Sequence, residues 1–249
     1  MSYGQPSRRV AVVGANRIAF ARNNTAYATS SNQDMMTAAI SGLVERYKLS
    51  GELIGEVAGG AVLKHSRDFN LIRESVLGTT LDPRTPACDI QQACNTGMEA
   101  AVYIANKISL GQIECGIAGG VDTASEVPLV FGEKLRKIFL AANMAKTTGG
   151  KLSQLLKIRL KYFAPVAPQN SEPRTGMAMG DHTQVTARYY GITREAQDEL
   201  ALQSHLKLAK AYDRGFFNDL ITPYMGLEHD NILRPDTTLE KLAKLKPAF

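Results

Sequence analysis

The stretch Ile90-Gln91-Gln92-Ala93-Cys94-Asn95-Thr96-Gly97-Met98 decides the interpretation of the chain, because it joins two elements of different type. Residues 87–92 predict a short strand, and residues 96–110 predict a helix. A cysteine at this junction lies at the helix N-terminus, where the helix dipole favours the thiolate and backbone N–H groups face the sulfur. A buried structural thiol is the alternative, since free cysteines are often buried. Cys94 is therefore the candidate nucleophile.

Strand and helix patterns alternate on both sides of this junction. Short apolar runs predict strands at 56–63 and 114–121, and the run from Val10 to Val13 predicts a buried first strand. Apolar residues at helical spacing predict helices at 33–48 and 70–77. This order predicts an α/β layered sheet and argues against a helix bundle or a β-sandwich.

The helix expected at 96–110 is apolar or small on nearly every side. Such a helix is normally buried all round and needs one layer above it and another below. The strands of this chain supply one sheet. We therefore expect one face of the helix to be exposed in this chain alone, as an apolar patch that invites a partner.

The pattern changes from Asp122 onward. Residues 122–190 are irregular, basic and interrupted by proline, with helical patches at 134–142 and 151–161. A longer helix is expected to start at Thr193, a good N-cap, and to end at Asp213. These changes predict a core at 1–121, a basic α-rich loop subdomain at 122–190, and a helix returning to the core within 191–249.

The positive charge of the chain is concentrated in the loop subdomain. The net charge is +5, and between Glu133 and Glu172 there are eight basic residues and no acid. A solvated loop, attraction of a phosphorylated small molecule, and docking to a membrane or a partner through 134–163 are three open readings. Leu152, Leu155, Leu156 and Leu160 form an apolar stripe that suits a surface or a partner. Nucleic acid is disfavoured, because no recognised binding motif accompanies the charge.

Composition sets the remaining bounds. No apolar run reaches the ~20 residues of a membrane span, and Met1 to Arg9 lacks the apolar core of a secretory signal, so we expect the cytoplasm. The three cysteines form no paired motif, and the four histidines have no ligand spacing, so no metal site is expected. Cys115 is expected to be a core thiol inside a strand, and Cys88 a structural one.

Several segments, taken in order along the chain, resemble the thiolase family. The segment Cys94-Asn95-Thr96-Gly97-Met98-Glu99-Ala100 is similar to the family's nucleophile segment. The other similar segments are 10–20, 117–125, Met179-Gly180, 193–205, Leu233-Arg234-Pro235 and 242–249. The resemblance therefore covers essentially the whole chain. The basic insertion from Lys134 to Pro165 is most similar to the fatty-acid β-oxidation branch, such as the β subunit of trifunctional complexes.

The resemblance implies a fold and an activity. The implied fold is α/β: a thiolase-like N-terminal half with a layered mixed sheet and a buried central helix, plus the loop subdomain. The implied activity is acyl transfer on 3-ketoacyl-CoA, with Cys94 carrying the acyl group. Met179 and Gly180 would belong to the coenzyme A loop, and His182 could touch coenzyme A, which is a substrate; no cofactor is implied. N-terminal halves pair in the family, so a homodimer is implied.

The family's remaining catalytic segments carry a His, an Asn and a second Cys, and none is recognisable here. The resemblance therefore implies an incomplete site that needs a complementary C-terminal half. A non-catalytic interaction or dimerisation module, docking to such a half or to a β-oxidation partner enzyme, is the alternative. A third reading is a thiolase-fold synthase that adds acetyl-CoA to a ketone; the Met179-Gly180 loop and the helix after it argue against that reading.

Overall fold

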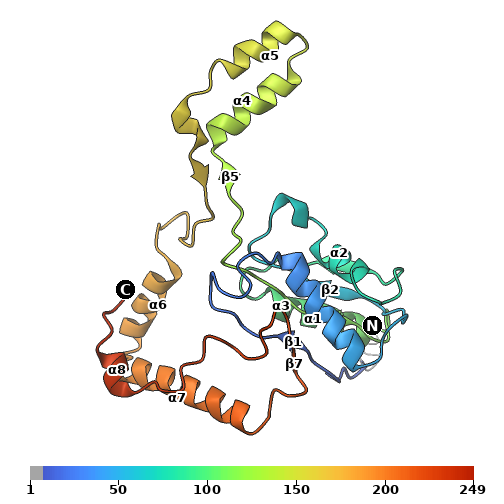
Figure 1. The fold of residues 1–249 in the computed structure, drawn as a ribbon, viewed down its shortest axis with the longest axis vertical. Helices are drawn as coiled ribbons and strands as arrows, with labels where there is room; N and C mark the ends of the chain where they lie inside the picture. The colour runs from blue at the N-terminus through green and yellow to red at the C-terminus, as the bar shows by residue number, and fades with distance from the viewer. Residues whose placement is uncertain (1–7) are drawn as a thin grey trace, which may run out of the picture.

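The structure is a computed structural model and describes residues 8–249 (Figure 1). The expectation that Met1 to Arg9 contains no secretory signal falls mostly outside the described residues. No helix within 8–249 is long and apolar enough to cross a bilayer.

A three-stranded parallel sheet forms the centre of the fold, in the order β3 (Ala87–Asp89), β2 (Val57–Gly59), β4 (Ile117–Ala118). Residue Ala58 of β2 is in register with Cys88 of β3 and Ala118 of β4. The loop subdomain, by contrast, holds an antiparallel pair, β5 (Val130–Phe131) with β6 (Pro165–Val166). The sheet predicted as mixed is thus parallel in the core.

Helices cover both faces of this sheet. Helices α1 (Asn32–Arg46) and α2 (Leu71–Leu77) pack with Val57 in one apolar cluster. Helix α3 (Thr96–Ser109) packs against Ala58 through Ala100 and Ile104 on the opposite face. Successive strand residues point to opposite faces, so β2 contributes Val57 to one cluster and Ala58 to the other. The predicted α/β layered fold is confirmed.

The central helix α3 is buried on one side only. Ala100 and Ile104 face the sheet and are buried, whereas Met98 and Val102 are 64% and 44% exposed. The expectation of one uncovered apolar face is confirmed.

The run from Val10 to Val13 is not a buried strand, and that prediction is wrong. Among residues 8–249 the run has no strand partner, and Val12 and Val13 are 94% and 89% exposed. Its backbone is anchored only at its two ends, where the Arg8 N–H donates to the Ser109 carbonyl and the Ala15 N–H donates to the Tyr47 hydroxyl. A β-branched run needs a neighbouring strand edge, and a cavity separates this one from β4.

The first strand observed is β1 (Arg17–Ile18), which pairs in parallel with β7 (Ile221–Thr222). Beside this pair, the Arg17 guanidinium makes two hydrogen bonds of 2.7 and 2.9 Å to the buried carboxylate of Asp230. The same carboxylate accepts from the Phe20 N–H at 2.6 Å. These contacts tie the beginning of the chain to its last quarter.

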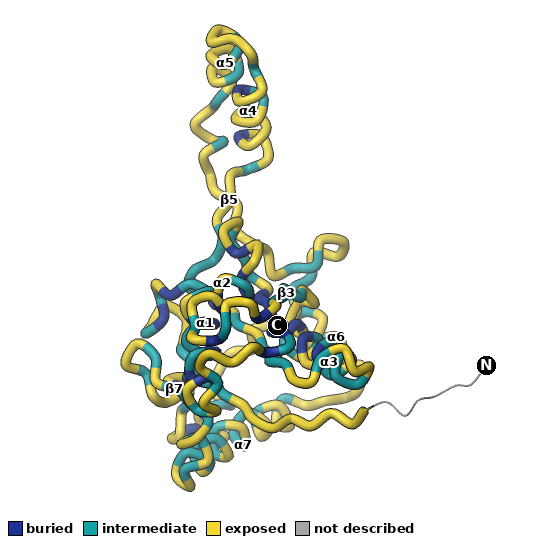
Figure 2. Tube along the Cα trace, turned by 90° about the vertical axis from the view of Figure 1, so that its right-hand side faces the viewer, coloured by how far each residue is buried: buried dark blue, intermediate teal, exposed yellow. Residues whose placement is uncertain are grey.

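The loop subdomain projects from the rest of the molecule as a helical hairpin (Figures 1 and 2). It consists of α4 (Glu133–Met144), α5 (Thr148–Leu155) and the short helix η2 (Leu160–Phe163), closed at its base by β5 and β6. The single helix expected at 151–161 is therefore wrong, since 156–159 separates α5 from η2. Most of the hairpin is exposed, and its own small core contains the fully buried Leu135.

Three further helices follow: α6 (Met179–Tyr189), α7 (Arg194–Asp213) and α8 (Leu239–Ala243). The Thr193 hydroxyl accepts from the Ala196 N–H at 3.2 Å, which confirms the predicted N-cap of α7. A short 3₁₀ turn, η1 (Ser66–Asp68), precedes α2.

Candidate functional site

Cys94 lies in the tight turn between β3 and α3, at the carboxyl edge of the parallel sheet. Its side chain is exposed. The preceding residue, Ala93, has a φ of +46°, a left-handed conformation that costs a residue with a Cβ about 1–2 kcal/mol. Strain of this kind persists only where the surroundings impose it, and it is frequent at functional sites.

A local hydrogen-bond network imposes this turn. The buried Thr96 hydroxyl donates to the Ala93 carbonyl at 2.7 Å and accepts from the Gln92 N–H at 2.9 Å. The Asn95 side-chain amide donates to the Gln92 side chain at 2.8 Å. The N–H groups of Asn95 and Thr96 donate to backbone carbonyls, whereas the Cys94 N–H has no such acceptor among residues 8–249. That N–H is available to a developing oxyanion beside the sulfur.

Glycines allow α3 to start this close to the sheet. A Cβ on Gly60 would overlap the Ile90 carbonyl oxygen and touch the Thr96 methyl group. On the other side, Gly97 lies directly against Gly120, at the end of β4. The N-terminus of α3 therefore packs between the ends of β2 and β4, and this contact fixes the position of Cys94.

Two carboxylates immobilise the loops around this edge. Asp122 accepts from the N–H groups of Val62 and Leu63 at 2.7 and 3.0 Å. Asp89 accepts from the N–H groups of Leu71 and Ile72 at 3.2 and 2.9 Å, which caps α2. Both acids follow or end a strand, and they hold the loop backbone at the edge where ligands of open α/β sheets bind.

A second polar cluster lies along α3, on the sheet side. The buried carboxylate of Glu56 accepts from Tyr103 at 3.1 Å and pairs with the Lys107 ammonium. Burial works to raise the pKa of Glu56, but the hydrogen bonds from Lys107, Cys88 and Tyr103 outweigh it, so the pKa lies below its ordinary value. Burial raises the pKa of the Cys88 thiol, which favours its protonated form.

The three remaining predicted site residues lie together, away from Cys94. Met179 and Gly180 open α6, and Gly180 lies directly against the ring of Phe249. Met179 and His182 are exposed. Helix α6 stands apart from α3 (Figure 1), and within residues 8–249 no hydrogen bond joins these residues to Cys94.

Cys115 differs from its prediction as a core thiol, because it is exposed. It precedes β4, and this edge of the sheet is open. In the part of the chain that the structure describes, no group of three or more His, Cys, Asp or Glu side chains is arranged to hold a metal ion.

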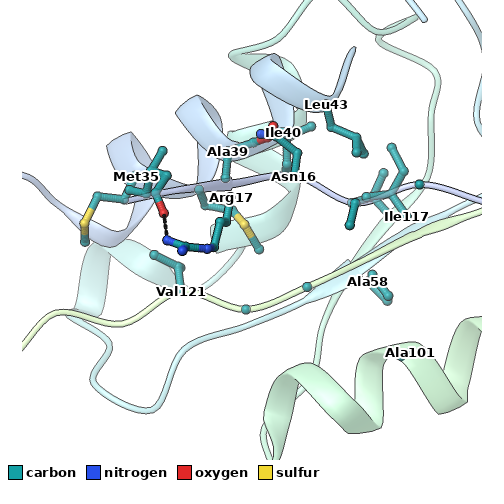
Figure 3. Close-up of a pocket in the computed structure, with 18 of the residues that line it drawn as sticks. Asn16, Arg17, Met35, Ala39, Ile40, Leu43, Ala58, Ala101, Ile117 and Val121 are labelled. Carbon is teal, nitrogen blue, oxygen red and sulfur yellow. Dashed lines mark hydrogen bonds between the residues drawn. The ribbon is translucent and has the colours of Figure 1, made fainter. Parts of the chain in front are cut away.

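A cavity of about 970 Å³ lies along this open edge. Figure 3 shows α1 side chains such as Met35 and Ile40 on one side, with β4 and Ala101 of α3 on the other. The exposed segment 10–16 forms its far wall. The N–H groups of Ile117 and Gly119 donate to β2, so by the strand pleat those of Gly116, Ala118 and Gly120 face the cavity. The cavity is therefore a slot between β4 and segment 10–16, and each of these could pair with an added strand. Cys94 does not line this slot.

The sequence agrees with one family model along almost its whole length. Residues 10–249 match the model described as thiolase, N-terminal domain. This chain belongs to the thiolase family. A 3-ketoacyl-CoA thiolase of Aliivibrio fischeri is 38% identical over 247 residues, which cover 97% of this chain and 56% of the relative. One from Yersinia pestis is 37% identical, with 57% of the relative covered.

The solved structures agree with this family assignment. The crystal structure of the Bacillus anthracis acetyl-CoA acetyltransferase superposes with a TM-score of 0.75 at 25% identity, covering 94% of this chain and 57% of that one. The chain therefore spans a little over half the length of the curated relatives it matches.

The sequence analysis did not identify some of the residues that shape the turn around Cys94. The left-handed conformation of Ala93 has no sequence signal, since alanine usually avoids it. Thr96 could have been found, because a hydroxyl at the start of a predicted helix is a common capping residue. Asp89 and Asp122 each end or follow an expected strand, and a carboxylate there could have been predicted to bind the N–H groups of neighbouring loops.

Proposed function

We propose that this thiolase transfers acyl groups from 3-ketoacyl-CoA through an acyl-Cys94 intermediate. The observation that carries the proposal is the exposed Cys94 on a strained turn at the N-terminus of α3. The 3-ketoacyl-CoA thiolases among its relatives support this substrate class. Within the thiolase family, we propose that this chain belongs to the fatty-acid β-oxidation branch that contains the β subunits of trifunctional complexes. We also propose that it acts in the cytoplasm.

The chemistry begins at the sulfur. The Cys94 thiolate attacks the ketone carbon, and the new oxyanion accepts a hydrogen bond from the free Cys94 N–H. Collapse of this adduct breaks the bond between the ketone carbon and the adjacent methylene, and the electron pair leaves as the enolate of acetyl-CoA. The enolate takes a proton, and the acyl group remains on Cys94 as a thioester. Free coenzyme A, as its thiolate, then removes the acyl group.

The base that deprotonates Cys94 and the acid that protonates the enolate are not among the side chains around the turn. We propose that a complementary thiolase half supplies both, either further along the same protein or on a partner. Coenzyme A would lie between Cys94 and the segment containing Met179, Gly180 and His182, once that half is in place.

The test is the intact mass of the protein after incubation with a short 3-ketoacyl-CoA. We expect a gain of one acyl group, its absence in Cys94→Ala, and its retention in Cys115→Ser, the matched control whose thiol is also exposed. An adduct that follows Cys115 would contradict the assignment. No adduct on a folded protein would show that the thiol needs the complementary half, and would favour the second candidate.

The second candidate is an interaction module, and the slot at β4 favours it. The slot is apolar, is bordered by unpaired N–H groups of β4, and is continuous with the uncovered face of α3. A β-strand of a complementary half fits such an edge by β-augmentation. We also propose a homodimer, and light scattering should then give twice the 27.0 kDa of one chain. A monomer at micromolar concentration would contradict the homodimer.

A further inference from the structure

We infer that Asn95 is a positioning residue for Cys94, because its two hydrogen bonds to Gln92 hold the strained turn around the sulfur. These two bonds are called the Gln92–Asn95 clamp below. The inference adds a residue to the proposed acyl-transfer site and rests on that proposed function. Asn95 forms no bond with the substrate in this role and acts only through the backbone of the turn.

The clamp spans the nucleophile. The Asn95 side-chain amide donates to the Gln92 side-chain oxygen at 2.8 Å, and the Asn95 N–H donates to the Gln92 carbonyl at 3.0 Å. Both residues are exposed, and Cys94 lies between them in the chain. A single exposed hydrogen bond adds little to stability, since water competes for both partners. Two bonds between the same two residues, however, fix the orientation of Gln92 relative to the start of α3.

The first peptide group of the turn needs this restraint. The positive φ of Ala93, +46°, depends on the orientation of the peptide that joins Gln92 to Ala93. A flip of this planar peptide would bring φ into the negative range that alanine prefers. The same flip would turn the Gln92 carbonyl away from the Asn95 N–H. The clamp therefore opposes the relaxation that would relieve the strain at Ala93.

The second peptide group sets the direction of the Cys94 N–H. Its carbonyl, on Ala93, accepts from the Thr96 N–H at 3.2 Å and from the Thr96 hydroxyl at 2.7 Å. A trans peptide directs its N–H opposite to its carbonyl, so the Cys94 N–H points away from Thr96. Among residues 8–249 that N–H has no backbone acceptor. Thr96 and the clamp thus hold one peptide group each, and together they keep the N–H open to an oxyanion.

Asn95 does not act as a helix cap instead. It directly precedes α3, where asparagine often caps, but its side chain accepts from no N–H of that helix. Ser31 and Thr193 cap α1 and α7 from an extended backbone, with ψ of 163° and 165°. Asn95 has a ψ of 5°, which does not suit capping. The bond to Gln92 is therefore the contact that its amide makes in this turn.

Acetylation of Cys94 by p-nitrophenyl acetate tests the inference without coenzyme A or a complementary half. The thiolate attacks the ester carbonyl carbon, the oxyanion accepts from the Cys94 N–H, and collapse breaks the bond to the p-nitrophenolate leaving group. Iodoacetamide alkylates the same sulfur without forming an oxyanion. Every protein carries Cys115→Ser, which removes the other exposed thiol, and peptide mass spectrometry assigns both products to Cys94.

The variant Asn95→Ala should slow acetylation about two- to tenfold, the range for loss of one hydrogen bond, and should change alkylation by less than about twofold. Gln92→Ala should slow acetylation equally. The double variant should be no slower than either single variant, since all three remove the same side-chain bond. The matched control Gln91→Ala removes the neighbouring exposed amide, which is not part of the clamp, and should react like the parent.

An exchange of the two side chains separates positioning from a general structural effect. Gln92→Asn alone shortens the clamp and should slow acetylation. Gln92→Asn combined with Asn95→Gln keeps the combined length, and both amides still offer a donor and an acceptor, so the parent rate should return. Unchanged thermal unfolding would show that each variant is folded.

Three results would overturn the inference: parent-like acetylation of Asn95→Ala, equal slowing of acetylation and alkylation, or an exchanged pair as slow as Gln92→Asn. A parent protein that takes no acetyl group from the ester would overturn it too, because its Cys94 N–H would then stabilise no oxyanion. The expected pattern with the ester, in a protein that takes no acyl group from 3-ketoacyl-CoA, would support the inference and contradict only the proposed substrate.

Discussion

At the residue scale, the turn around Cys94 is shaped by two neighbours that take no part in bond making. Ala93 adopts a left-handed conformation, and its exposed methyl group gains little from packing. Thr96 closes the turn through its buried hydroxyl. The strain at one residue is therefore maintained by the hydrogen bonds of another, and the two can be tested separately.

The variant Ala93→Gly should raise the free energy of unfolding by up to about 1 kcal/mol, because glycine adopts a positive φ without strain. Urea denaturation measures the change. Asn24→Gly is the matched control, since Asn24 also has a positive φ but asparagine tolerates it, and it should change little. A clear loss of stability in Ala93→Gly would mean that the left-handed conformation of Ala93 does not destabilise the folded protein.

The variant Thr96→Val should lower the free energy of unfolding by about 1–3 kcal/mol. Valine keeps the shape but leaves the Gln92 N–H without its acceptor. Thr186→Val, on the exposed face of α6, removes a hydroxyl bonded to the His182 carbonyl and should cost under about 0.5 kcal/mol. Equal effects in the two variants would contradict a special role for Thr96. Slower alkylation of Cys94 by iodoacetamide in Thr96→Val would further show that the hydroxyl positions the thiol.

At the element scale, the close packing of α3 against the end of β2 depends on Gly60, which has no Cβ. Gly60→Ala should lower the free energy of unfolding by at least about 2 kcal/mol, because the added methyl group overlaps the Ile90 carbonyl, a backbone atom that cannot easily move. Gly149→Ala, in α5 with open space around it, should instead stabilise its helix by about 0.5–1 kcal/mol. Differential scanning calorimetry of the pair measures both. A Gly60→Ala protein as stable as the parent would mean that α3 can shift outward at no cost.

The sequence predicted most elements because their signals are local. The strand, cysteine and helix order around Cys94 and the N-cap at Thr193 depend on neighbouring residues, and both are confirmed. Val10 to Val13 was mispredicted because burial of a strand depends on a distant edge, and the edge of β4 is separated from it by the cavity. Whether Met179, Gly180 and His182 approach Cys94 depends on contacts between elements, which periodicity does not encode. The division at 121/122 and 190/191 remains a proposal.

At the scale of the whole molecule, the ion pair between Arg17 and Asp230 joins the two ends of the fold. Asp230→Ala should lower the free energy of unfolding by about 3 kcal/mol, because it removes the counter-charge of the Arg17 guanidinium and the acceptor of the Phe20 N–H. Asp236→Ala, an exposed acid paired with Lys241, should change it by less than about 1 kcal/mol. Guanidinium denaturation measures the free energy of unfolding of both variants. Equal losses would show that the buried Arg17–Asp230 pair contributes no more to stability than the exposed pair does.

Acid should destabilise the protein by protonating Asp230, which pairs with Arg17, and Glu56. Burial works to raise the pKa of Asp230, but the hydrogen bonds from Arg17 and the Phe20 N–H outweigh it, so the pKa lies below its ordinary value, like that of Glu56. The unfolded chain then takes up protons first as the pH falls. The stabilisation is complete above the unfolded pKa of about 4 and is lost as the pH falls through the folded values. Thermal unfolding between pH 2 and 7 should show this slope, and Asp230→Asn should flatten it; an identical slope in that variant would exclude Asp230 as a source.

The pairing of Arg17 with Asp230, 213 positions apart, also bears on how the protein is made. At about 5–20 residues per second of synthesis, the segment around β1 waits about 10–40 s on the ribosome before β7 and Asp230 emerge. For about the second half of that interval, once β4 has emerged, the nascent chain exposes Val12, Val13 and the bare edge of β4 together. The newly made protein should therefore be an early client of ribosome-associated chaperones, released only when its last quarter has left the exit tunnel.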